Sequence, residues 1–220
     1  MGQKLGRAKL SADAASYANL PAAAVEAAWR DFSLNSDGWG LDLAGFQHLC
    51  AVIAAALGDG QAGPDVAAGV GDASALALFH LMDTDNNDLV DGLELLSAIG
   101  ALSTMPGADK LRFLARCFDL GGGGRLSRDE LCLLLRTTLA GLCKLYDGGA
   151  APPASAAIDR TVELVFTHTG AGARDAISIE PLCLYLQSDP VAASWLGHFD
   201  DVSDTMTTVA AATAAAAADP

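Results

Sequence analysis

The chain has 220 residues and a formal net charge of −14, from 13 basic and 27 acidic side chains. This length is enough to bury a hydrophobic core, which excludes a peptide-sized or wholly disordered protein. The acidic balance excludes nucleic acid as the main partner, because phosphate binding needs clustered lysine and arginine. It favours cations or basic protein segments as partners.

The five cysteines are scattered and form no C-x-x-C pair. This pattern argues against a disulfide framework or a zinc site and favours free thiols in a reducing compartment. No apolar run approaches the roughly 18 residues of a membrane span. The chain begins Met-Gly with basic residues close behind, and myristoylation of Gly2 would add a weak contact with a membrane.

Helical patterns alternate with four polar or glycine-rich interruptions along the chain, and the abundance of alanine and leucine supports helix throughout. Residues 11–32 have a helical pattern with a break at Pro21. Later helices are expected at 46–57, 73–82, 92–102, 110–118, 128–146, 158–167 and 180–187. The interruptions centre near residues 37, 87, 123 and 172, and linkers are expected at 58–72 and 147–155.

The second interruption, residues 83–94 with the sequence DTDNNDLVDGLE, carries the strongest chemical signal. Calcium is a hard cation that takes about six to eight oxygen ligands, and a twelve-residue loop can supply them from positions 1, 3, 5, 7, 9 and 12. These positions hold Asp83, Asp85, Asn87, the backbone carbonyl of Leu89, Asp91 and Glu94, the last of them bidentate. Magnesium would compete for the same carboxylates.

This loop resembles the calcium loop of the EF-hand family. Phe79 and Met82 give the preceding helix an apolar face, and Val90 holds the eighth position, where the family has an apolar residue that pairs with a neighbouring loop. The one departure is Asp88, where the family has glycine in a left-handed conformation. Asp tolerates that conformation at a cost of about 1 kcal/mol, so we expect the site to survive.

The third interruption, residues 119–130, is a weaker copy of the same loop. Asp119, Ser127 and Glu130 hold positions 1, 9 and 12, and Leu126 keeps the apolar eighth position. Glycines at positions 3 and 5 remove two ligands. We therefore expect a hand that keeps its geometry and binds calcium only weakly.

The first and fourth interruptions are degenerate by the same comparison. Leu41 at the eighth position of the first loop leaves Gly45 at position 12, whereas aligning the loop's polar residues instead needs a one-residue insertion. In the fourth loop Ile177 holds the strand position and Pro181 stands where the glutamate belongs. Neither loop is expected to bind metal.

The expected fold is all-α, with two lobes that each pair two EF-hand units through short antiparallel strands between their loops. We expect a flexible arm at 1–14, a first pair at 15–105 with the intact hand at 75–102, a second pair at 108–200 and a disordered alanine-rich tail at 201–220. Within the second pair, the third hand covers 110–143 and the degenerate fourth hand covers 157–190.

Four hands in two pairs resemble the calmodulin, calcineurin B-like and neuronal calcium sensor superfamily, and residues 17–32 are similar to the first helix of calcineurin-B-like proteins. The resemblance implies a calcium sensor or regulatory subunit, not an enzyme, that binds an amphipathic helix of a partner protein. The alternative is a structural, light-chain-like subunit of a cytoskeletal or ciliary assembly, with binding largely independent of calcium. We expect a cytoplasmic protein, with a cilium or a membrane surface as the alternative locations.

The C-terminal half is expected to be open without calcium, because its loops lack the ligands with which calcium could switch it. Its groove would then be lined by apolar side chains of both hands, namely Leu131, Leu134, Leu135, Leu182 and Trp195. The alternative is a closed half whose apolar residues all lie in its own core.

Overall fold

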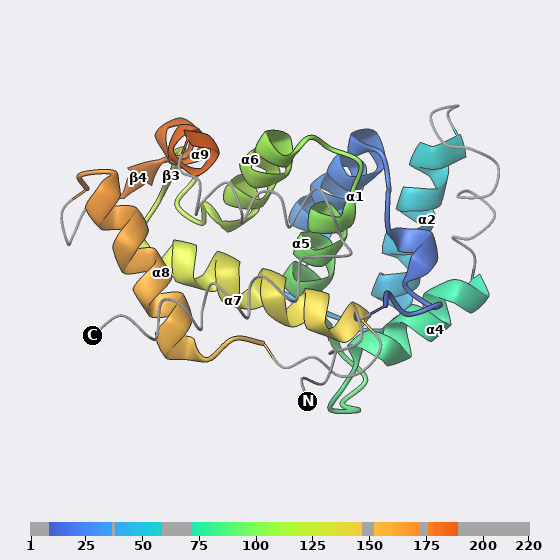
Figure 1. Ribbon diagram of the computed structural model, residues 1–220. Helices are drawn as coiled ribbons and strands as arrows, with labels where there is room; N and C mark the ends of the chain where they lie inside the picture. The colour runs from blue at the N-terminus through green and yellow to red at the C-terminus, as the bar shows by residue number, and fades with distance from the viewer. Residues whose placement is uncertain (1–8, 37, 59–71, 147–151, 172–175, 189–220) are drawn as a thin grey trace, which may run out of the picture.

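The computed structural model describes residues 9–36, 38–58, 72–146, 152–171 and 176–188, and over these ranges the protein is mainly helical (Figure 1). One short 3-10 helix, η1 (Ala15–Tyr17), comes first. The α-helices are α1 (Ala22–Asn35), α2 (Leu43–Gly58), α4 (Asp72–Met82), α5 (Gly92–Leu102), α6 (Gly107–Phe118), α7 (Arg128–Leu145), α8 (Ser155–His168) and α9 (Ile179–Ser188). Four two-residue strands lie between them: β1 (Gly40–Leu41), β2 (Val90–Asp91), β3 (Arg125–Leu126) and β4 (Ile177–Ser178). No helix in the described ranges is long and apolar enough to cross a membrane.

From α2 onward the helices lie where the sequence pattern predicts them. α5 has the predicted bounds, and the other helices differ from the predicted ranges by up to three residues at an end. Side chains cap the starts of several helices: Asp91 caps α5, and Ser127 and Glu130 form a capping box at the start of α7.

The N-terminal segment corrects the sequence prediction. Between residues 9 and 21, only the single turn of η1 forms, in place of the first half of a helix. Of the arm predicted at 1–14, residues 9–14 pack against the fold, where Ser11 N–H donates to the Leu145 carbonyl at 2.9 Å and Ala14 is fully buried. These contacts are long-range in sequence, so no local pattern reports them. Gly2, the linker at 59–71 and the tail from 189 onward lie outside the described residues.

Two small antiparallel sheets join the loops in pairs. β1 pairs with β2, with Leu41 opposite Val90, and β3 pairs with β4, with Leu126 opposite Ile177. These are the four apolar residues that the sequence places at the eighth position of each loop, so the predicted strand pairing is confirmed. The Leu41 pairing favours the alignment of the first loop that leaves Gly45 at position 12.

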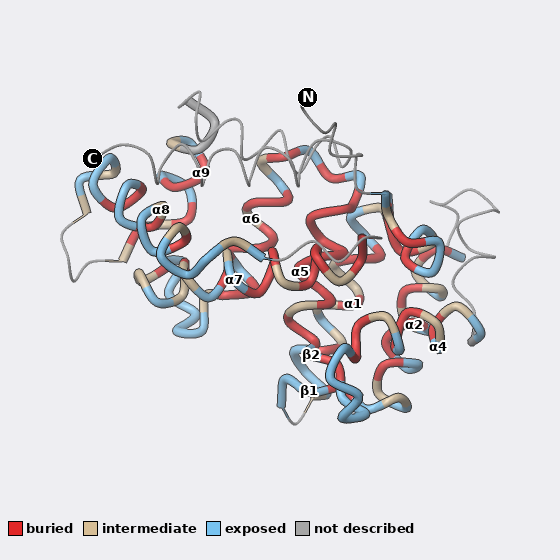
Figure 2. Tube along the Cα trace, turned by 60° about the horizontal axis from the view of Figure 1, so that its bottom comes forward, coloured by how far each residue is buried: buried red, intermediate tan, exposed pale blue. Residues whose placement is uncertain are grey.

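A continuous hydrophobic core runs through the described residues, with α5 at its centre. Every residue of α5 except Glu94 is buried, and Figure 2 shows this helix in red between α1 and α7. α5 packs against α7 and also against α1 and α6. At the α5–α7 contact a Cβ on Gly141 would lie 2.2 Å from the Glu94 carbonyl oxygen, so only glycine lets the two backbones approach this closely. Because α5 and α7 belong to different predicted lobes, the division into two separate lobes is not confirmed.

The apolar residues predicted to line an open C-terminal groove lie in this core instead. Leu131, Leu134 and Leu182 are at most 4% exposed, and Leu135 is partly buried. Their helices, α7 and α9, both pack against α6. The prediction of an open half is therefore wrong for the described residues, which show the closed alternative; Trp195 lies outside them.

Candidate metal centre

The loop between α4 and α5 is shaped by its first carboxylate. Asp83 follows the end of α4, is only 6% exposed, and accepts the backbone N–H groups of Asn87 and Asp88, each at 3.1 Å. Asn86 and Asp88 have φ values of 54° and 61°, the left-handed backbone that Asn and Asp tolerate better than most residues. The predicted left-handed conformation of Asp88 is confirmed.

Two further hydrogen-bonded groups complete the loop. Asn87 Nδ2 donates to Asp85 Oδ2 at 2.9 Å, and Asn87 Oδ1 accepts the N–H of Leu89 at 2.9 Å. Asp91 Oδ1 accepts two backbone N–H groups in the first turn of α5, at 2.8 and 3.1 Å. Asp91 therefore caps the helix with one oxygen, and its second oxygen is not used in the cap.

The carboxylate at position 12 is paired with a lysine from another helix. Glu94 Oε2 lies 2.6 Å from Nζ of Lys144, which is close to the C-terminal end of α7. The two side chains are only 20% and 23% exposed. Although the two atoms are close, their geometry is not that of a hydrogen bond, and no donor among the described residues hydrogen-bonds to this buried oxygen. Lys144 is therefore a charge partner of Glu94.

A cavity of about 300 Å³ opens between the loop and α7. Its lining includes Asp85, Asn87, Leu89, Asp91, Glu94 and Lys144. As the side chains stand, no three His, Cys, Asp or Glu residues within the described ranges converge closely enough to hold a metal ion. The structure thus brings five of the six predicted ligand residues to one cavity, while Asp83 bonds to the loop backbone and Glu94 pairs with Lys144. The full ligand set stays a prediction.

The chemistry of the donors fits a hard divalent cation. Every predicted ligand offers oxygen, and residues 83–94 contain neither histidine nor cysteine. Glu94 Oε2 is a buried acceptor that makes no hydrogen bond and already lies beside the Lys144 ammonium, so its surroundings favour a positive charge. The residues that would hold calcium are Asp83, Asp85, Asn87, Leu89 through its carbonyl, Asp91 and Glu94. Calcium would supply charge neutralisation there and would join the end of α4 to the start of α5.

The third loop closes on itself through its first acidic residue. The Asp119 carboxylate accepts the N–H groups of Gly123 at 3.1 Å and Gly124 at 2.6 Å. Gly122 and Gly124 have φ values of 63° and 68°, where only glycine is free of strain. Asp119 therefore makes the same turn that Asp83 makes in the second loop.

The second acidic residue of this loop is also occupied by the protein. Glu130 Oε2 accepts the N–H of Ser127 at 2.8 Å and its hydroxyl at 2.7 Å, while Oε1 accepts the N–H of Leu120 at 3.0 Å. Burial alone would raise the pKa of Glu130, but these hydrogen bonds outweigh it and lower the pKa below its usual value. The structure thus brings Asp119, Ser127 and Glu130 into one loop, with the carboxylates serving as caps.

The first and fourth loops show no acidic group at position 12. In the first loop Asp42 Oδ1 accepts the N–H of Gly45 at 2.8 Å and so begins α2. In the fourth loop Pro181 lies in the first turn of α9, where a missing N–H is tolerated. Residue 37 and residues 172–175 lie outside the described residues.

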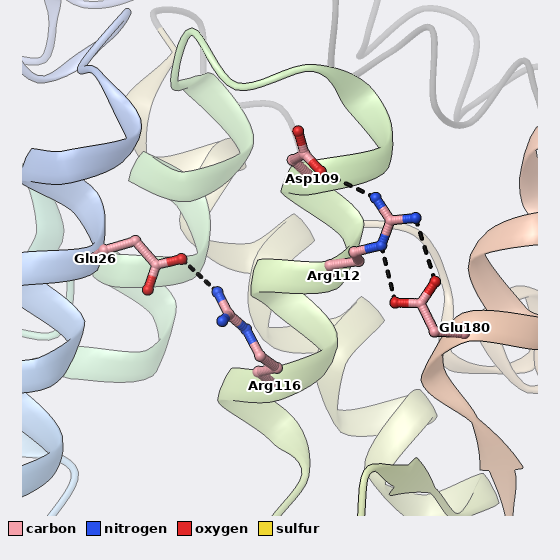
Figure 3. A network of polar contacts seen from close by, with 5 residues as sticks. All are labelled: Glu26, Asp109, Arg112, Arg116 and Glu180. Atoms are coloured by element: carbon pink, nitrogen blue, oxygen red, sulfur yellow. Dashed lines mark hydrogen bonds and ion pairs between the residues drawn. The ribbon is translucent and has the colours of Figure 1, made fainter.

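A second polar cluster lies where α6 meets α1 and α9 (Figure 3). Arg112 donates from two nitrogens to Glu180, at 3.0 and 3.2 Å, and from a third to Asp109 at 2.9 Å; Arg116 pairs with Glu26. A cavity of about 760 Å³ adjoins these residues. The cluster links α6 to α1 and α9. Because carboxylates already pair with both arginines, it offers no unpaired cationic group to an anionic ligand.

Sequence reasoning missed the role of one residue and the presence of another, for different reasons. The capping role of Glu130 was visible as a Ser-x-x-Glu pattern at 127–130, which is a known start of a helix. The contact of Lys144 with Glu94 had no such signal, because the two residues are far apart in the chain and meet only through the packing of α7 on α5.

Comparison with known proteins gives one partial likeness to report. No protein-family model matches this chain. Over 60 residues the chain is 35% identical to "Calcium-binding protein K" of Dictyostelium discoideum. The matched segment covers 27% of this chain and 31% of that protein, so less than a third of the relative is represented. The likeness is to a calcium-binding protein and does not distinguish the branches of the EF-hand superfamily.

Proposed function

We propose that this protein is an EF-hand calcium-binding protein whose dominant site is the loop at residues 83–94. The observation that carries the proposal is the shape of this loop, in which oxygen-bearing residues lie on both sides of the left-handed turn at Asp88 and the second half of the loop leads into the β1–β2 pair. The segment of likeness to a Dictyostelium calcium-binding protein supports the same ion.

The four helix–loop–helix units are, in this proposal, two EF-hand pairs with a shared core. The β1–β2 pair joins the first loop to the second, and the β3–β4 pair joins the third to the fourth. Extensive packing of α5 on α7 supports a joint core over two independent lobes. A conformational change at the second loop would then alter the packing of helices in both pairs.

The proposed role is regulatory: calcium at the second loop alters how the protein holds a helical segment of a partner protein. The net charge of −14 suits a basic segment. Glu94 lies on α5, which packs against α1, α6 and α7, so a change in its contacts reaches the helices at the centre of the molecule. Calcium can alter partner binding only through such differential contacts.

A structural, light-chain-like subunit is the second candidate. The observation that favours it is the third loop, where hydrogen bonds from the protein itself satisfy Asp119 and Glu130. A loop closed in this way keeps its shape without calcium. Partner binding by the C-terminal helices would then be largely independent of the ion.

Titration calorimetry on the metal-free full chain tests the calcium site. We expect one dominant site with a Kd of order 10⁻⁷–10⁻⁵ M, weakened when magnesium is present. Glu94→Gln should abolish this binding, whereas Glu130→Gln, the same change at position 12 of the third loop, should leave the Kd within about twofold. No binding by the wild type, or a larger loss from Glu130→Gln than from Glu94→Gln, would refute the proposal.

The two roles are separated by affinity capture of partners on the full chain, with calcium and with a chelator. A partner retained only with calcium supports the regulatory role. A partner retained equally in both conditions supports the structural subunit.

A further inference from the structure

Lys144 reaches the candidate metal centre because of a glycine one turn before it. Residues three apart in a helix share a face, so Gly141 and Lys144 lie on the same side of α7. The absent side chain at Gly141 lets the α7 backbone approach the Glu94 carbonyl, to which a Cβ would be only 2.2 Å away. This close approach places the Lys144 ammonium 2.6 Å from the Glu94 carboxylate.

The ammonium group occupies the surroundings that a metal ion would use. Lys144 lines the same cavity of about 300 Å³ as Asp85, Asn87, Asp91 and Glu94. With Lys144 23% exposed and Glu94 20% exposed, solvent and salt screen this pair less than a surface ion pair. The fold therefore places a positive charge of its own in the cavity that five of the six predicted ligand residues line.

Calcium and the Lys144 ammonium compete for the Glu94 carboxylate. A bidentate glutamate gives both oxygens to the ion, and a divalent cation repels an ammonium group a few ångströms away. Calcium binding therefore weakens the Lys144–Glu94 contact. The free energy lost from that contact is subtracted from the free energy of calcium binding, because the protein binds the ion only in the state in which Glu94 is available.

We propose that Lys144 is a built-in competitor that sets the calcium affinity of the second loop: it holds Glu94 in the metal-free protein and is displaced when calcium binds. The inference rests on the proposed calcium site at residues 83–94. Displacement of Lys144 removes an ion pair between α5 and α7, so calcium occupancy is communicated to the C-terminal helices. By linkage, a partner that draws Lys144 away raises the calcium affinity by the same factor by which calcium favours that partner.

The test compares calcium titrations of the full-length wild type, Lys144→Gln and Arg136→Gln. Arg136 lies on the same helix and pairs with Asp159, so its substitution removes the same charge from α7 and leaves Glu94 untouched. Exposed ion pairs are worth up to about fivefold in an equilibrium constant, and this pair is more enclosed. We expect Lys144→Gln to tighten calcium binding by about five- to tenfold and Arg136→Gln to change it by less than about twofold.

A second measurement follows the lysine itself. Acylation of the wild type with an amine-reactive reagent, read by mass spectrometry, should modify Lys144 slowly without calcium and several-fold faster with it. If Lys144→Gln does not fold, as judged by circular dichroism, Lys144→Met keeps the apolar stem of the side chain and carries the same expectation for calcium affinity.

Equal calcium affinity in the wild type and the folded Lys144 variant, or Lys144 labelling that is indifferent to calcium, would overturn the inference. The proposed calcium site survives that result as long as the wild type binds calcium and Glu94→Gln does not. Absence of calcium binding by the wild type would instead remove the proposed function together with the inference.

Discussion

The contact between α5 and α7 predicts a large effect from a small substitution, Gly141→Ala. The added Cβ would lie 2.2 Å from the Glu94 carbonyl oxygen and 3.0 Å from the Ala98 Cβ. The nearest neighbour is backbone, so it cannot rotate away as a flexible side chain could. Because non-bonded heavy atoms settle near about 3.5 Å, the two helices must separate by about 1.3 Å along this line.

The magnitude follows from two opposing contributions. Overpacking a well-packed core costs about 1–3 kcal/mol, and a clash with rigid backbone belongs at the upper end. Alanine returns about 1 kcal/mol through its better helix propensity. The net loss of unfolding free energy is therefore about 2 kcal/mol. With a urea m-value of about 2 kcal/mol/M, the unfolding midpoint falls by about 1 M.

The assay is urea unfolding of the metal-free protein followed by circular dichroism. Gly58→Ala is the matched control, because Gly58 ends α2, has no atom of the described residues within 4 Å of its would-be Cβ, and has no left-handed backbone. We expect the control to stay within about 0.5 kcal/mol of the wild type. A Gly141→Ala midpoint equal to or above that of the wild type would refute the close packing of α5 on α7.

Two other expectations concern single side chains. Among the five cysteines only Cys132 is partly exposed, while burial raises the pKa of the buried thiols Cys50, Cys143 and Cys183 to about 11. A thiol reagent at pH 8 should therefore modify Cys132 first in the folded protein and all five cysteines in urea. Early modification of two or more thiols, or an unchanged fast phase in Cys132→Ser, would contradict this. The lowered pKa of Glu130 means that its carboxylate contributes stability above the ordinary glutamate value of about 4.3, and this contribution is lost as the pH falls through the lowered folded value. The urea midpoint of calcium-free Glu130→Gln should therefore lie below that of the wild type at pH 7, with the gap closing in acid; a gap that is constant with pH would show that the cap does not depend on charge.

The third loop shows how far local sequence reasoning reaches. Its spacing correctly placed Leu126 opposite Ile177, because the position of an apolar residue within a loop of fixed length decides which residue meets its neighbour. The same spacing could not say how Glu130 is used. Its two oxygens are taken by Ser127 and Leu120, and that choice depends on the hydrogen-bond donors that the folded loop presents.

The N-terminal segment shows the opposite limit. Its alanine-rich pattern favoured helix, yet in residues 9–21 only η1 forms, since Ser11 and Ala14 are held by contacts with distant parts of the chain. Helix propensity amounts to a few tenths of a kcal/mol per residue, which such tertiary contacts readily outweigh.

The sequence by itself determined the helices from α2 onward, the twelve-residue spacing of the second and third loops, and the apolar residues through which the first loop pairs with the second and the third with the fourth. Each of these depends on periodicity or spacing over a short stretch of chain. Only the tertiary structure decided that α5 packs against α7, that Gly141 makes this contact close, and that Lys144 therefore lies on Glu94. An amphipathic pattern states which face of a helix is buried, but it does not name the helix that covers that face. The partner of the most important carboxylate in the candidate site was for that reason invisible in the sequence.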